Sequence, residues 1–305
     1  MARTWGALWI VYIVWGSTYL AIDLAIDSIP PLFMLAARFA FAGLILYAIV
    51  GRRVRTTPRQ WLAATGIGTL LLGVGTGGVA FAEQRIDTGL VALIVAIVPL
   101  WVAVLDRVVW GRKLTRGGAA GIAIGLVGVA LLVDPAGASG RELVGALMPI
   151  VGSFCWAFGS LWARSAPLPE QPLVAAAMEM IGGGVVLFVA SFAIREDVSL
   201  GAITGASLAG VAYLVVFGSL VAYSAYAWLL QRAPASLVAT YAYVNPVVAV
   251  ALGSLFLSEP LTGTMVAGGA AIVTAVALIV RSENREARIV ALRRANEEEA
   301  ATLAA

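Results

Sequence analysis

Long apolar stretches follow one another along almost the whole chain, separated by short polar breaks or breaks rich in Pro and Gly. A helix needs about 17–25 such residues to cross a bilayer. None of the stretches alternates with a period of two, as the strands of a membrane barrel do. The pattern therefore predicts an all-α integral membrane protein with ten transmembrane helices, near residues 5–25, 32–50, 61–82, 88–108, 117–133, 143–163, 172–194, 205–229, 236–257 and 262–280.

The basic residues are distributed unequally between the two sides that these spans define. Ten spans place both termini on one side. Sixteen of the twenty Lys and Arg residues fall on that side, three fall on the other, and Arg38 lies inside a span. Because loops rich in Lys and Arg stay in the cytoplasm, both termini are expected to be cytoplasmic. The clean asymmetry also supports the count of ten.

Composition agrees with the membrane assignment and excludes several kinds of chemistry. Of the 305 residues, 61% are hydrophobic and 12% are charged, against about 25% charged in soluble domains. A single cysteine, Cys155, excludes an internal disulfide. The absence of histidine excludes His-ligated metals and a Ser-His triad. We expect no cofactor, no metal and no nucleic-acid partner, only a lipid bilayer and a small-molecule substrate.

The two halves of the chain resemble each other at a nearly fixed offset. Pro31 matches Pro172 at an offset of 141, and Pro99 matches Pro246 at 147. A repeat of five helices is odd, so the second copy enters the membrane from the opposite face. Inverted repeats of this kind are common in secondary transporters. The predicted organisation is two inverted five-helix repeats and a charged cytoplasmic tail, at 5–133, 143–280 and 281–305.

The two charges deepest inside apolar runs occupy equivalent places in these repeats. At the offset of 141, Arg38 corresponds to Glu179. Ionisable residues inside a membrane face the bundle interior or a wet cavity. Arg38 can therefore meet Glu179, a backbone carbonyl or a substrate carboxylate. Two readings stay open, a structural ion pair and a role in substrate binding or gating.

Four short motifs together resemble the drug/metabolite transporter superfamily, EamA family. The segment YAYVNPVVAVALGSLFLSEPLT at 241–262 is similar to the family signature, and 91–115 is its first-half counterpart. Trp15-Gly16-Ser17 and Cys155-Trp156-Ala157 resemble the elements of helices 1 and 6. The resemblance implies a ten-helix transporter of small metabolites, frequently an exporter of amino acids or related compounds. The first half departs from the pattern, because Arg112-Lys113 replaces the usual acidic residue.

Further candidates come from residues whose chemistry is unusual at their depth. Glu83 ends the third span. The simpler interpretation is that its side chain is exposed at the membrane interface, and the more specific one is that it lies at the mouth of a cavity. Pro99 and Pro246 remove amide hydrogens within their spans and so are candidate hinges. Asn245 adds a polar group at the same depth. The complete set expected to line a cavity or bind substrate is Trp15, Ser17, Tyr19, Arg38, Glu83, Trp101, Trp156, Glu179, Tyr223, Tyr241 and Asn245.

The sequence is thus interpreted as an inner-membrane secondary transporter, working by alternating access through a cavity lined by helices 1–4 and 6–9. Its substrates would be amino acids or related compounds, in the direction of efflux. The glycine-rich run at 73–78 is not a nucleotide site, because it lies inside a span. A gradient must therefore supply the energy for transport. Glu179 is the best candidate for a proton carrier. Lipophilic cations or drugs, sugars and other carboxylates remain alternative substrates. An intramembrane enzyme or a scaffold is disfavoured. The oligomeric state, monomer or homodimer, is left open.

Overall fold

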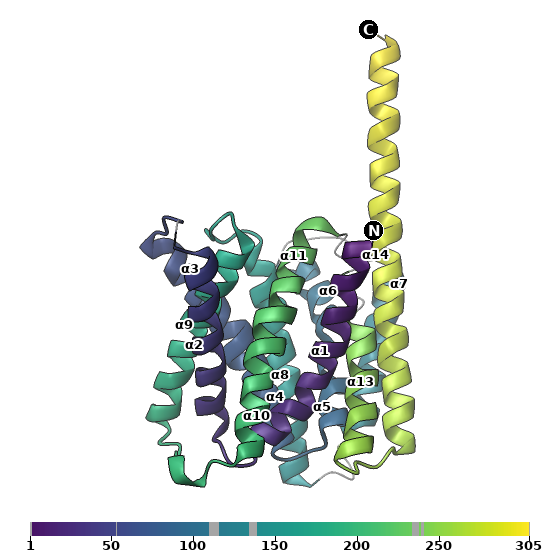
Figure 1. Cartoon of the computed structure of the whole chain (residues 1–305). Coiled ribbons are helices and arrows are strands. Elements are labelled where there is room, and N and C mark those ends of the chain that lie inside the picture. The colour runs from purple at the N-terminus through teal and green to yellow at the C-terminus, as the bar shows by residue number, and fades with distance from the viewer. Residues whose placement is uncertain are drawn as a thin grey trace.

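The computed structural model describes residues 2–52, 54–109, 116–133, 139–233, 238 and 241–304. Their backbone forms a bundle of helices, with both termini at the same end (Figure 1). We call this end the terminus face and the other end the far face. The elements of the first half are α1 (Ala2–Ile26), α2 (Pro31–Val50), α3 (Pro58–Gly68), η1 (Thr69–Gly75), α4 (Thr76–Glu83), α5 (Thr88–Val95), α6 (Val98–Val108) and α7 (Arg116–Val133).

The second half has the same plan. Its elements are α8 (Gly140–Ala163), α9 (Pro172–Ala193), η2 (Leu200–Ala202), α10 (Gly205–Tyr213), η3 (Leu214–Tyr223), α11 (Ser224–Arg232), α13 (Tyr241–Phe256) and α14 (Gly263–Ala304).

Ten spans are present, as the apolar pattern predicts. Within the described residues, nine helical stretches are long and apolar enough to cross a bilayer, and a shorter apolar helix covers Val244–Phe256. The outer surfaces of these spans carry large apolar side chains: Leu62, Phe192 and Leu255 are each more than three-quarters exposed. A continuous apolar exterior is what lipid contact requires. The predicted all-α membrane fold is confirmed.

The packing of the spans obeys the inverted repeat. Span 2 packs on span 7 through α2 and α9, and span 5 packs on span 10 through α7 and α14. Span 1 contacts span 9, just as span 4 contacts span 6. Span 3 packs on span 6, just as span 8 packs on span 1. Each contact has a partner related by exchange of the two halves, which is the signature of a pseudo-two-fold axis.

Two spans contain wide π-helical turns that the apolar pattern did not predict. In span 3 the turn is η1, and in span 8 it is η3. Under the offset of 147, η1 falls within η3. Single π turns are rare and concentrate at functional sites. Both of these turns include residues that face the space between the halves.

Span 4 is divided, although the sequence suggested one continuous helix. It consists of α5 and α6, and Pro99 is the second residue of α6. Proline has no amide hydrogen, so the helical ladder cannot continue through Val95. The chain turns at Ala96 and Ile97, where the amide of Leu100 donates to the carbonyl of Ile97. Pro246 lies inside α13, as expected.

Two carboxylates hold helix ends at the far face. Glu196 accepts from the amides of Leu32 and Phe33, the first free N–H groups of α2. Glu259, the acidic residue of the 241–262 motif, accepts from the amides of Thr88 and Gly89 at the start of α5. A carboxylate at a helix N-terminus satisfies unpaired donors and complements the helix dipole. The first-half counterpart, Arg112-Lys113, lies outside the described residues.

Close helix packing accounts for the glycine ladder of α7. Gly117 faces Ser282 and Gly121 faces Ala275, both on α14, while Gly125 faces Leu100 of α6 and, less closely, Ala275. The ladder is therefore used within the fold. The helix α14 itself continues without a break from the last span, and Figure 1 shows it extending well past the terminus face.

Candidate functional site

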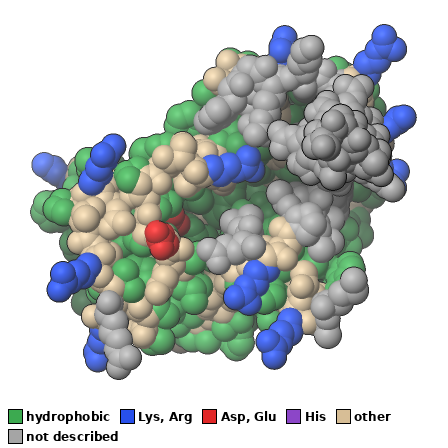
Figure 2. Space-filling view, turned by 90° about the horizontal axis from the view of Figure 1, so that it is seen from above, with side chains coloured by type: hydrophobic (Ala, Val, Ile, Leu, Met, Phe, Trp, Pro, Cys, Tyr) green, Lys and Arg blue, Asp and Glu red, His purple; other side chains and the backbone are tan. Residues whose placement is uncertain are grey.

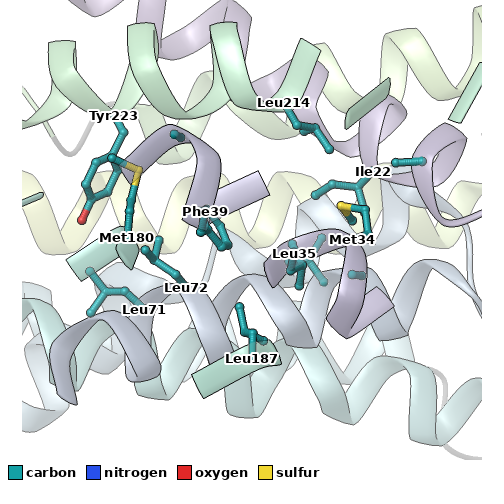
Figure 3. Packing of buried hydrophobic residues seen from close by; sticks show 14 of the residues in the cluster. Ile22, Met34, Leu35, Phe39, Leu71, Leu72, Met180, Leu187, Leu214 and Tyr223 are labelled. Atoms are coloured by element: carbon teal, nitrogen blue, oxygen red, sulfur yellow. The ribbon is translucent and has the colours of Figure 1, made fainter. Parts of the chain in front are cut away.

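A central cavity lies between the two halves. It has an empty volume of about 960 Å³, counting space open to solvent. Its walls come from α1, α2, η1, α4, α5 and α6 of the first half and from α8, α9, η3 and α13 of the second. These are spans 1–4 and 6–9, the set that the sequence analysis names. Figure 3 shows one part of the wall, where Met180, Leu72 and Tyr223 lie close together.

Arg38 is the charged residue of this otherwise neutral wall, among the lining residues that the structure describes. Its side chain is 5% exposed. Nε donates to the Ser219 hydroxyl at 3.1 Å, and the guanidinium lies 4.7 Å from the centroid of the Phe39 ring. Nη1 is buried and has no hydrogen-bond partner among the described residues. A buried cation with a free donor, facing a cavity, is an arrangement that attracts an anion.

Glu179 does not form the ion pair with Arg38 that the repeat symmetry suggested, although both side chains are described. Its Oε2 accepts from the Tyr223 hydroxyl at 2.7 Å, while Arg38 binds Ser219. Both partners belong to η3 and stand four residues apart, so one helical turn supplies a hydroxyl to each charge. Sequence reasoning missed Ser219, and the only signal for it is a single serine in the otherwise apolar and aromatic run LVVFGSLVAY.

Removing the Tyr223 hydroxyl tests the support of Glu179. Tyr223→Phe is expected to lower the free energy of unfolding by about 1.5 kcal/mol, because a buried carboxylate would lose its donor and gain none. Thermal unfolding of the purified protein in detergent measures the change. Tyr47→Phe is the control, since that hydroxyl reaches Thr56 only at 3.5 Å. Equal shifts in the two variants would contradict the assigned hydrogen bond.

An aromatic cluster around Trp15 forms another part of the wall. The Trp15 ring centroid lies 4.9 Å from that of Tyr226, 5.3 Å from Tyr241 and 6.1 Å from Trp156. Its indole N–H donates to the Gly218 carbonyl at 3.2 Å, which ties α1 to η3. Trp15, Trp156 and Tyr241 line the cavity, together with Tyr19. Several separate aromatic predictions thus meet at one surface.

Asn245 and Pro246 also line the cavity. With the amide nitrogen turned toward the nearby carbonyls, Asn245 donates to Tyr12 at 3.1 Å and to Tyr241 at 3.3 Å. Its side chain therefore joins α1 to α13 beside the proline.

Five of the residues expected in the cavity wall or at a hinge are not lining residues: Ser17, Trp101, Pro99, Glu83 and Glu179. Ser17 bonds the Tyr213 hydroxyl at 2.7 Å, in the contact between α1 and α10. Trp101 packs edge-on against Phe154, with ring centroids 5.4 Å apart. Pro99 opens α6 but is not a lining residue. The rotation of each helix turns the Ser17 and Trp101 side chains toward other contacts.

Glu83 is buried, which corrects the simpler interpretation of interface exposure. Its side chain is 8% exposed, and neither carboxylate oxygen has a hydrogen-bond partner among the described residues. It lies at the end of α4, one turn beyond the cavity-lining Val79.

Comparison with known proteins points to one family. A model of the EamA-like transporter family matches residues 4–134 and again 143–281. The chain is 41% identical over 278 residues to the uncharacterized inner membrane transporter YedA of Escherichia coli (strain K12), covering 90% of this chain and 89% of the relative. It is 25% identical over 283 residues to a protein of Salmonella typhimurium (strain LT2) named "Probable amino-acid metabolite efflux pump", covering 87% and 90%.

The fold is shared with a solved structure. A crystal structure at 20% sequence identity aligns with a TM-score of 0.65 over 93% of this chain and 98% of its own.

Proposed function

Because the chain belongs to the EamA-like transporter family, we propose that it exports small metabolites bearing a carboxylate, amino acids above all, through its central cavity. The observation that carries the proposal is the free Nη1 donor of Arg38, which is buried in the cavity wall. A substrate carboxylate would accept from this donor and neutralise the guanidinium.

The rest of the cavity suits the other parts of such a molecule. The ring faces of Trp15 and Tyr241 offer an apolar surface for a side chain and can attract an ammonium group. Tyr223 lines the cavity, and its hydroxyl binds Glu179 behind the cavity wall. The carboxylate of Glu179 thus places negative charge near Tyr223, one helical turn from Ser219. A zwitterion would then lie along η3, with its carboxylate toward Arg38.

The expected membrane is the inner membrane, with the terminus face in the cytoplasm. In Figure 2, which looks onto this face, Lys and Arg side chains lie mostly around the rim and few acidic groups are visible. Cytoplasmic loops carry such an excess of positive charge. The names of the relatives support both the inner membrane and the direction of efflux.

Alternating access would move the two halves about the cavity, and the irregular backbone offers places to bend. We propose Pro99, at the division of span 4, and Pro246, inside α13, as the paired hinges. They correspond under the repeat and lie near the depth of the cavity. Hinge motion at such positions leaves the packed helix pairs intact.

Flux into liposomes tests the proposal. The purified protein would be reconstituted and assayed with a panel of labelled amino acids and, for each, the amine that lacks the carboxylate. Arg38→Gln is expected to reduce amino-acid flux about tenfold, the equivalent of about 1.4 kcal/mol for one charged hydrogen bond. Amine flux should stay level or rise, since a repelling cation has been removed.

Arg59→Gln is the matched control, because Arg59 is exposed at the terminus face. Wild-type flux of amino acids by a folded Arg38→Gln variant would overturn the assignment of Arg38. Failure of the wild type to move any amino acid would overturn the substrate class. Preferential transport of lipophilic cations would transfer the binding role to Glu179.

A further inference from the structure

Glu83 has a combination of properties that transport of a carboxylate substrate does not explain. Its carboxylate is more than nine-tenths buried, and both oxygens lack partners in the described part of the chain. The neighbouring carboxylates differ in this respect, because Glu196 and Glu259 use their oxygens to cap helices. An ionised carboxylate in that position would pay an unpaired desolvation penalty of several kcal/mol.

The surroundings increase this penalty. The carboxylates of Asp23 and Glu259 lie near enough to act on the Glu83 charge, and Asp27 acts in turn on Asp23. Among the described groups, two of the three arginines at this end donate to backbone carbonyls, Arg85 to Phe81 and Arg141 to Gln84. The third, Arg195, is exposed.

The loop that contains Asp87, beside this site, lies in the same negative electrostatic potential. Partial burial and the carboxylates of Glu259 and Glu142 raise the pKa of Asp87. The nearby Tyr19 hydroxyl is a further titratable group that senses Glu83. No cation within the described residues balances the negative charge of Glu83. A proton or a cation from outside must therefore neutralise it.

A second buried polar group marks the same end of the cavity. Thr88 is 2% exposed, and its hydroxyl has no partner among the described residues, although its amide binds Glu259. In the described chain, no group of three or more metal-binding side chains is close enough to hold a metal ion. The arrangement therefore suits a proton better than a coordinated metal.

The site continues the cavity toward the far face. Residues four apart on a helix share one face. Glu83 follows Val79 by one turn on α4, and Asp23 follows Tyr19 by one turn on α1, where Val79 and Tyr19 line the cavity. Opening the far face would bring water first to these carboxylates.

We propose that Glu83 is a proton-binding site coupled to opening of the far face. A proton from water adds to one carboxylate oxygen and forms the neutral acid when this end is packed, as in this structure. When the end opens, the O–H bond breaks, the proton returns to water and the hydrated carboxylate is left. The coupling to substrate rests on the proposed transport function, but the proton site itself does not.

Infrared spectroscopy of the protein in lipid tests the site without any substrate. The C=O stretch of protonated carboxyl groups is recorded between pH 5 and 9, with its shift in D₂O as identification. Wild-type protein is expected to keep such a band at neutral pH, and Glu83→Gln to remove it. Asp197→Asn, which changes an exposed acid at the same end, should leave the band unchanged. A band that survives Glu83→Gln and disappears in Glu179→Gln, or no band at neutral pH, would overturn the proposal.

A second readout tests coupling. Liposomes containing a pH-sensitive dye would report the protons moved for each labelled amino acid moved. Glu83→Gln is expected to reduce this ratio at least tenfold, while Asp197→Asn keeps it. An unchanged ratio in Glu83→Gln would overturn the coupling. If no amino acid is transported, the infrared result still decides the proton site, so the two proposals fail separately.

Discussion

Gly68→Ala is expected to lower the free energy of unfolding by about 3 kcal/mol, at the upper end of what overpacking causes. A Cβ on Gly68 would meet the backbone carbonyl of Glu179 at less than contact distance. A clash with backbone cannot be relieved by rotating a side chain, so α3 and α9 must separate. The shift would also displace the Glu179 carboxylate from Tyr223. Thermal unfolding in detergent measures the first effect.

Gly77→Ala provides a matched control in the same span. A Cβ there meets no atom within 4 Å. Alanine favours a helix over glycine by about 1 kcal/mol, so this variant should be as stable as the wild type or more so. Similar melting temperatures for the two variants would contradict the close approach of α3 and α9.

Glu196→Ala is the second large effect, with an expected loss of about 2 kcal/mol. Pro31 has no amide hydrogen, so the first donors of α2 are the amides of Leu32 and Phe33, and Glu196 accepts from both. It also accepts from the Ser191 hydroxyl at 2.7 Å. Its removal leaves all three donors without this acceptor, and unfolding monitored by circular dichroism reports the change.

Two further variants separate the cap from a general effect of charge. Glu196→Gln keeps the shape and an acceptor oxygen, so about half of the stability should return. Glu170→Ala removes an exposed carboxylate and should change stability by about 0.5 kcal/mol or less. A loss in Glu170→Ala equal to that in Glu196→Ala would argue against capping as the cause.

The number of spans and their approximate limits could be predicted from the sequence because lipid imposes simple rules on length and polarity. The repeat offset also agrees with the structure, since it relates Pro99 to Pro246 and η1 to η3. Depth in the membrane follows directly from residue number, at 1.5 Å per residue. The offset pairs Arg38 with Glu179 in the sequence, and their relative height in the membrane stays a prediction.

The direction in which each side chain points around its helix axis was harder to predict from the sequence. A helix turns about 100° for each residue, and a π turn changes the phase of every residue after it. The offset could not reveal that η3 would present Ser219 to Arg38 and Tyr223 to Glu179. Glu83 was misjudged for a related reason. Hydropathy marks the end of a span without saying whether neighbouring helices cover it.

The wide turns η1 and η3 also bear on how the two halves match each other. A π turn accommodates one residue more than an α turn, so it changes the direction in which every later side chain of its helix points. The two turns occupy corresponding places in halves that now differ at most positions. Both halves thus carry the same change of helical phase beside the cavity. Deleting one residue from either turn alone would therefore break the match between the two halves.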